Sequence, residues 1–325
     1  MRIYLRTIML LISTLIYGGE YGDAFIIAST PSNIRALNFS NGASIIDMGA
    51  SFINPAGQSG KYLHLSYNHQ SSLFTNIILE SGIALEQGYS LGATLIHAGY
   101  GDINFRPDLS QLTPLERRDS IRISTNDTWG TFTAREEALF LTLSKNYSTV
   151  FDLGWRFFKI PTTIPMGINM KIINKQIDEN IAYGIGLDLG SQLKMDLSDV
   201  GFMTHNTNLN LGLVVRDILN TPIYWTSMHQ DAILRHTAFY VGTEKRIPAI
   251  KSNINLYMSY NHNGKKLKQY GFEYSFADKI SLMVGLGSIE KNLGFKISWK
   301  RSKLFYSISM LDYANNNNIS YSYNF

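Results

Sequence analysis

The chain has 325 residues, enough for one large domain or two ordinary ones, and contains no cysteine, which excludes disulfides, thiolate catalysis and cysteine-based metal sites. Its net charge of +4 comes from scattered Lys and Arg residues, a pattern that does not argue for a nucleic-acid partner. Charged residues make up only 17% of the chain and aromatic residues 12%, which suits a wall that faces lipid between two aromatic belts.

The N-terminus has the layout of a secretory signal peptide. Arg2 and Arg6 precede an apolar run from Ile8 to Tyr17, and small residues follow this run. The run is shorter than the roughly 20 residues that a membrane-spanning helix needs. A buried helix is the alternative. We assign residues 1–24 to a signal peptide whose cleavage site lies somewhere between residues 18 and 28.

From residue 62 onward, apolar and polar residues alternate as they do in half-exposed β-strands. Such alternation over segments of about ten residues is typical of the tilted strands of a transmembrane barrel, which are apolar outside and polar inside. The candidate strands are 62–68, 76–86, 88–97, 136–145, 150–158, 166–175, 182–195, 207–216, 236–245, 252–261, 268–276, 279–288, 292–300, 303–311 and 318–325.

Strand parity and turn lengths select one topology. Bacterial single-chain barrels have an even number of strands, and removing 150–158 leaves fourteen while all the tight turns fall at the periplasmic end. Residues 151–160 would then belong to a long periplasmic connection. An extra strand near residues 43–53 would instead give sixteen. We predict an all-β fold, a transmembrane antiparallel β-barrel of about fourteen strands over residues 62–325.

Two connections, residues 98–135 and 217–235, are long enough to be binding loops or lids. The predicted topology places both on the exterior, and both are rich in aromatic residues. We therefore expect one or both to fold over or into the barrel mouth. If the protein binds a protein partner there, Trp129, Tyr224 and Trp225 are plausible exterior anchors.

The last strand supports this class of fold. Ile319, Tyr321, Tyr323 and Phe325 share one face, and bacterial outer-membrane barrels usually end on such an aromatic residue. A soluble all-β sandwich would also show alternating strands. It is disfavoured because the other face of most strands carries Gly, Ser, Asn, Gln and charged residues, the wrong composition for a soluble core.

No catalytic or metal-binding constellation stands out. The seven histidines are dispersed and there is no Gly-x-Ser-x-Gly elbow, so we expect no enzymatic activity, cofactor or metal site. The alternation does place charged side chains in the lumen, where they either pair to stiffen the interior or clamp an inserted plug. The lumen-facing polar residues on which we focus are Lys171, Asp188, Lys194, Arg216, Glu273 and Lys296.

Several short motifs occur in a characteristic order: Asn54-Pro55-Ala56-Gly57 before the first strand, then Asp188-Leu189-Gly190, Gly212 to Ile218, and Gly271-Phe272-Glu273-Tyr274. In this order the chain resembles the PorV/PorQ-like family within the long-chain fatty-acid transporter (FadL-like) superfamily, over roughly residues 33–325. The resemblance implies a fourteen-stranded outer-membrane barrel. Residues 25–61 would form a hatch segment in its lumen, with Asn54, Pro55, Ala56 and Gly57 as the hatch motif.

The resemblance also implies two activities. Our first hypothesis is a role in type IX-like secretion or surface presentation of exported proteins. The second is FadL-like uptake of hydrophobic small molecules, and the third is a structural barrel that only docks partners. The partners would be outer-membrane lipid and, depending on the activity, exported proteins, secretion components or hydrophobic molecules. We expect any apolar pocket in the lumen to be small, because charged side chains interrupt it.

Overall fold

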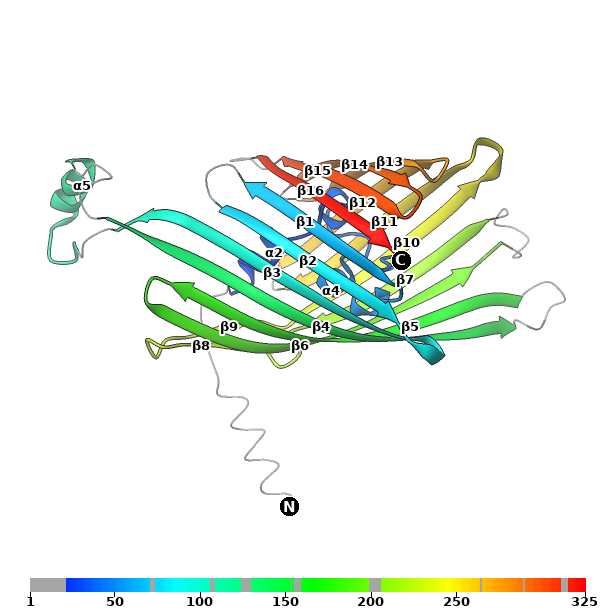
Figure 1. The fold of residues 1–325 in the computed structure, drawn as a ribbon, viewed down its shortest axis with the longest axis horizontal. Helices are drawn as coiled ribbons and strands as arrows, with labels where there is room; N and C mark the ends of the chain where they lie inside the picture. The colour runs from blue at the N-terminus through cyan, green and yellow to red at the C-terminus, as the bar shows by residue number, and fades with distance from the viewer. Residues whose placement is uncertain are drawn as a thin grey trace, which may run out of the picture.

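Fourteen antiparallel strands close into a barrel (Figure 1). The computed structural model describes residues 22–70, 74–105, 109–123, 130–152, 154, 159–198, 206–263, 265–288, 290–310 and 315–325. Neighbouring strands pair in sequence order, and β1 closes the ring against β16 with Ser66 opposite Ser320. The barrel strands are β1 (Tyr62–Gln70), β2 (Phe74–Ala84), β3 (Tyr89–Asn104), β4 (Thr131–Asp152), β5 (Lys159–Ile177), β6 (Asn180–Asp196), β7 (Thr207–Arg216), β10 (His236–Ile247), β11 (Ser252–Asn263), β12 (Lys265–Phe276), β13 (Ile280–Leu286), β14 (Lys291–Trp299), β15 (Ser302–Met310) and β16 (Asn315–Asn324).

The fourteen-stranded prediction is confirmed, including the removal of 150–158 as a separate strand. Residues 151–160 do not form the predicted long connection, because β4 and β5 continue to pair as far as Asp152 and Lys159. The sixteen-stranded alternative fails because residues 50–53 form a helix. The predicted connection 98–135 is also shorter than expected, since β3 and β4 still pair at Asn104 and Thr131.

The second long connection, 217–235, contains a hairpin of its own. Strand β8 (Thr221–Trp225) pairs with β9 (Gln230–Ile233) and also with the first residues of β6, beyond the end of β7. The hairpin therefore extends the wall at the exterior end, as defined by the predicted topology. Helix α5 (Pro114–Ile123) lies at that end too, on the arm between β3 and β4 (Figure 1).

Strand pleating sorts side chains between membrane and lumen. In β16, Ile319 and Tyr321 are exposed on the outer face while Ser320 and Ser322 are buried on the inner one. Large apolar side chains are exposed in this way on the outer face of every barrel strand with described side chains on both faces. Such a surface is stable in lipid and not in water. None of the described helices is long and apolar enough to cross a membrane.

The segment before β1 lies inside the barrel (Figure 1). It forms α2 (Ala24–Ala28), α3 (Ser32–Ala36), α4 (Ala50–Ile53) and the 3-10 turn η1 (Pro55–Gly57). Helices this short are not stable alone in water, so burial against the wall holds them. We call residues 22–61 the hatch. Two further 3-10 turns, η2 (Glu86–Gly88) and η3 (Pro248–Ile250), lie between barrel strands.

Wall glycines make the space that the hatch fills. At each of nine positions, on nine different strands, an added Cβ would come within 3.0 Å of a hatch atom. A side chain at any of them would push the hatch inward or out of place, so the glycines follow the path of the hatch around the wall. They are Gly82, Gly92, Gly167, Gly190, Gly212, Gly242, Gly271, Gly285 and Gly294.

Candidate functional site

The hatch motif is fixed to the wall at its first residue. Asn54 is fully buried, and its Nδ2 donates to the carbonyl oxygens of Gly42 (2.9 Å) and of Ser191 on β6 (3.0 Å). Its Oδ1 accepts from the backbone nitrogen of Ala56 at 3.1 Å, which closes the turn that Pro55 begins. One amide side chain therefore joins two hatch segments to the barrel, a role that a residue without both donor and acceptor could not fill.

Pro55, Ala56 and Gly57 lie in a cradle of wall glycines. Pro55 packs against Gly167 of β5 and Gly190 of β6, where no side chain could stand. Gly57 bonds back to the hatch, its carbonyl accepting from the backbone nitrogen of Asp47 at 2.8 Å. The motif thus lies where β5 and β6 present only backbone atoms to the lumen.

A buried ionic cluster lies where the wall is interrupted between β7 and β8. Lys171 Nζ contacts Asp188 at 2.9 Å and Asp217 at 2.6 Å, and all three side chains are almost completely buried. Asp217 has a left-handed backbone (φ 50°), and its backbone nitrogen donates to Asp188 at 2.9 Å. One lysine against two carboxylates leaves one formal negative charge. Because buried ions are costly unless paired, replacing Lys171 would leave two buried carboxylates without a cation and would strongly destabilise the fold.

The same cluster is linked to the hatch. Asn169 Nδ2 donates to the backbone oxygen of Ser51 at 2.7 Å and lies 3.4 Å from Asp188. Arg216, beside Asp217, donates to the backbone oxygen of Ile53 at 3.3 Å. Residues from the separate sequence motifs around 54, 188 and 216 therefore meet in one part of the lumen.

The remaining predicted lumen residues also face inward. Lys296 pairs with Glu273 at 2.7 Å on the far side of the barrel. Lys194 is half-buried and interacts electrostatically with the carboxylates of Glu244 and Asp47. The predicted lumen residues thus fall into two groups. Lys171, Asp188 and Arg216 lie together beside the hatch, and Glu273 pairs with Lys296. Lys194 belongs to neither group.

A further set of buried contacts between wall and hatch was not among the predicted sites. We call such contacts, including those of Asn54 and Asn169, clasps. Glu80 and His64 are fully buried, with His64 Nδ1 2.5 Å from a Glu80 oxygen. Glu80 also accepts from the backbone nitrogen of Gly49 at 3.1 Å and from the Ser51 hydroxyl at 3.4 Å. The signal was present in the sequence, since both residues lie on the polar faces of adjacent predicted strands.

Large apolar side chains stand among the polar ones on one side of the lumen, contrary to the expectation of polar inward faces throughout. Wall residues of β2 to β7 and β10 meet hatch residues and the β8–β9 hairpin in one cluster. Phe52 of the hatch lies 5.7 Å from Phe140 of β4 between ring centroids. We call this cluster the apolar lumen face. Its larger members are Phe25, Ile34, Ile45, Phe52, Ile53, Ile78, Ile96, Phe140, Ile173, Val214, Ile223, Ile233 and Tyr240.

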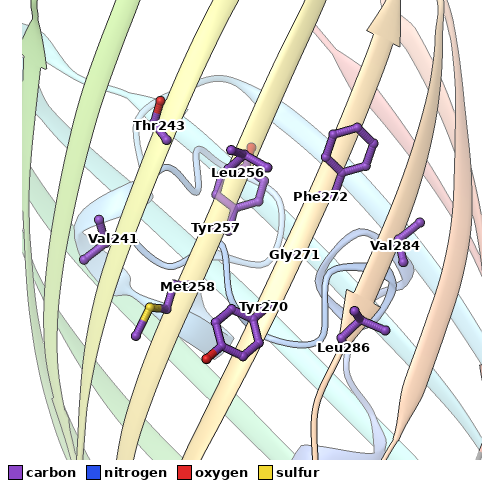
Figure 2. Close-up of a pocket in the computed structure, with 10 residues that line it drawn as sticks. All are labelled: Val241, Thr243, Leu256, Tyr257, Met258, Tyr270, Gly271, Phe272, Val284 and Leu286. Carbon is purple, nitrogen blue, oxygen red and sulfur yellow. The ribbon is translucent and has the colours of Figure 1, made fainter.

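Two apolar grooves lie on the outer surface, the first over one wall glycine that packs against the hatch and the second over two. The first, of about 390 Å³, is the β11–β12 groove (Figure 2), lined by Val241, Thr243, Leu256, Tyr257, Met258, Tyr270, Gly271, Phe272, Val284 and Leu286. The second, of about 530 Å³, is the β4–β6 groove, lined by Tyr89, Leu143, Ser144, Lys145, Tyr147, Met166, Gly167, Ile168, Leu189, Gly190, Ser191, Leu213 and Val215.

The three predicted exterior anchors differ in their positions. Trp129 lies outside the described residues. Tyr224 is 54% exposed, whereas Trp225 packs against the apolar lumen face and its Nε1 donates to Asp231 at 2.8 Å. Of the two described anchors, only Tyr224 is presented to the exterior.

Helix α5 begins with a capping box. The hydroxyl and backbone nitrogen of Thr113 donate to Glu116 at 2.7 and 2.9 Å, and these bonds lower the pKa of the Glu116 carboxyl below its usual value.

Among the described residues there is no group of three or more side chains suited to hold a metal ion.

A scan against models of protein families found no match, and a search of curated proteins found none either. Among solved structures, the P. putida toluene transporter TodX has 11% identity over 92% of this chain and 99% of its own, with a TM-score of 0.51. A deltaS2 mutant of TodX, described as a monoaromatic hydrocarbon channel, has 11% identity over 93% and 100%, with a TM-score of 0.50. The Ralstonia pickettii toluene transporter TbuX has 11% identity over 93% and 100%, with a TM-score of 0.47.

The two TodX structures share the barrel fold of this chain. Together with the apolar outer face and the closed ring of strands, this fold makes the protein an outer-membrane β-barrel.

Proposed function

We propose that the protein is a non-enzymatic, hatch-gated channel of the FadL-like kind that passes hydrophobic small molecules across the outer membrane. The apolar lumen face carries this proposal. It extends from Ile223 and Ile233 of the exterior hairpin to Phe140 within the wall, so a hydrophobic solute would meet contiguous apolar side chains from the mouth inward. Paired charges, including Lys175 with Glu136 at 2.8 Å, lie beside these side chains. A channel for polar solutes would be expected to have a polar interior instead, as porins do.

The hatch occupies this lining in the structure described. Phe25, Ile34 and Phe52 fill the space that a solute would need, and they belong to short helices that pack against the wall. Passage therefore requires the hatch to shift. The clasps at Asn54, Glu80 and Asn169 would be the contacts that resist the shift.

The proposal also draws on the fold shared with TodX, which is described as a toluene transporter. The charged residues expected to interrupt an apolar path lie beside the apolar lumen face. Lys171 pairs with both Asp188 and Asp217, so it neutralises one of the two carboxylate charges and leaves one formal negative charge.

Uptake by intact cells tests this function, since the outer membrane is the barrier. The chain would be expressed in a Gram-negative host without such a channel, and uptake of radiolabelled toluene and of glucose measured. We expect faster uptake of toluene only. The double variant Ile96→Thr/Ile173→Thr adds hydroxyls to the apolar lumen face and should slow toluene uptake about threefold or more. Ser307→Thr, outside the apolar lumen face, should not. Toluene uptake equal to that of the empty host would refute the proposal.

A second candidate is surface presentation of exported proteins, as the PorV/PorQ resemblance implies for type IX-like secretion. The supporting observation is that large apolar side chains are exposed at the exterior end: Met228 (94%), Leu219 (69%), Leu115 (65%) and Tyr224 (54%). Exposed apolar side chains can mark protein-binding surfaces. A photo-crosslinking amino acid at Met228 should capture an exported protein in the native host. Capture of lipid alone would exclude this candidate.

A further inference from the structure

We propose that the β4–β6 groove is a binding site for a phospholipid of the periplasmic leaflet, whose phosphate contacts Lys145. The site is separate from the transport path, and the inference does not depend on the proposed function. It rests on a lysine held between two tyrosines at one end of an otherwise uncharged groove.

Lys145 is positioned for a phosphate. It lies on the outer face of β4, because the alternate residues Thr142 and Ser144 are buried on the inner face. Its Nζ donates to the Tyr89 hydroxyl at 2.9 Å and lies 4.3 Å and 5.0 Å from the ring centroids of Tyr89 and Tyr147. The rings fix the ammonium group while leaving donors free, since an ammonium group has three.

The position of Lys145 in the barrel selects the leaflet. Lys145 pairs with Tyr89, the first residue of β3, directly after the turn η2 at the periplasmic end. Tyrosine and lysine side chains at strand ends are characteristic of the membrane interface, where lipid phosphates lie. A cation there faces the phosphates of the inner leaflet of the outer membrane.

The groove beyond Lys145 suits an acyl chain. It runs from β3 across β4, β5 and β6 to β7, four strand spacings of roughly 4.8 Å, or about 19 Å. Lys145 is the one charged residue that lines it, so the groove offers one site for an anionic headgroup and a long apolar surface for the chain.

The β11–β12 groove provides an internal comparison (Figure 2). It is also apolar and also overlies a hatch-bearing glycine, Gly271, but its lining residues include no lysine or arginine. An acyl chain could lie in it, but no side chain of the groove would recognise a phosphate.

Native mass spectrometry of the purified protein with added phosphatidylglycerol tests the proposal. We expect one lipid to bind tightly to the wild type. Lys145→Gln should weaken that binding about fivefold, from the loss of one cation near the headgroups. Ser191→Trp fills the middle of the groove from its outer face and should abolish the tight binding.

Two variants serve as matched controls. Lys300→Gln removes a lysine that also lies over an aromatic ring, that of Trp299 at 5.9 Å, but lines neither groove. Val284→Trp fills the β11–β12 groove. Both should bind phosphatidylglycerol like the wild type. The proposal is overturned if Lys145→Gln or Ser191→Trp also binds like the wild type, or if Lys300→Gln loses as much lipid as Lys145→Gln.

Discussion

A single methyl group on the wall should displace the hatch. In Gly167→Ala, the new Cβ would lie 2.5 Å from the backbone nitrogen of Ala56 and closer still to the carbonyl group of Pro55. Ordinary contact begins at 3.4 Å, so the hatch backbone must move by about 1 Å. Overpacking of this kind costs about 1–3 kcal/mol. We expect about 2 kcal/mol, because backbone atoms held by Asn54 cannot rotate away.

The consequence is a looser hatch in an intact barrel. A change of about 2 kcal/mol raises the population of the displaced hatch about 30-fold. Planar-bilayer recordings should therefore show more frequent openings for Gly167→Ala than for the wild type. The control is Gly101→Ala on β3, where an added Cβ meets no atom within 4 Å. If the two variants have the same opening frequency and the same thermal unfolding temperature, the wall glycines do not hold the hatch.

Three further predictions concern the clasps and the exterior arm. Asn54→Ala removes three hydrogen bonds and should lower the free energy of unfolding by about 2–4 kcal/mol, measured by thermal unfolding in detergent; a change below 0.5 kcal/mol would refute the role of Asn54. Lys171→Met leaves two buried carboxylates without their cation and should cost about 3–5 kcal/mol in the same assay, whereas an unchanged melting temperature would contradict the buried pairing. Because Thr113 lowers the pKa of Glu116, the capping box stabilises α5 at neutral pH, and this contribution is lost as pH falls through the lowered pKa. Hydrogen exchange of α5 amides should therefore be faster in Glu116→Ala than in the wild type at pH 7, with the difference becoming smaller in acid; equal exchange at pH 7 would exclude the cap.

The barrel was predictable because its strands follow a simple physical rule. Residues such as Ile319 and Ser320 alternate between lipid and lumen, so the sequence of each strand shows a hydrophobic period of two residues. Strand ends were harder to predict. Phe151 and Ile160 pair in a hairpin beyond the predicted strand ends, and an extended hairpin and a loop differ little in local composition.

The lumen was only partly predictable. The inward position of charged residues such as Lys171 and Glu273 followed from alternation, but their partners did not. Asp217 lies in a predicted loop, and only the interruption of the wall brings it to Lys171. The apolar lumen face was missed because segments such as that around Ile78 are apolar on both faces, and the inner apolar residues match hatch residues far away in the sequence.

Locking the hatch tests most directly whether solutes pass by its displacement. Ser32 of the hatch and Ser66 of β1 each lie 2.7 Å from the Ser320 hydroxyl of β16, and the chain has no cysteine of its own. The pair Ser32→Cys/Ser320→Cys can therefore join hatch to wall, while Ser66→Cys/Ser320→Cys joins wall to wall. With both disulfides formed, the account predicts that cells with the hatch–wall link lose toluene uptake until a reductant is added, and that cells with the wall–wall link retain it. Undiminished uptake through the hatch–wall-linked barrel would contradict it.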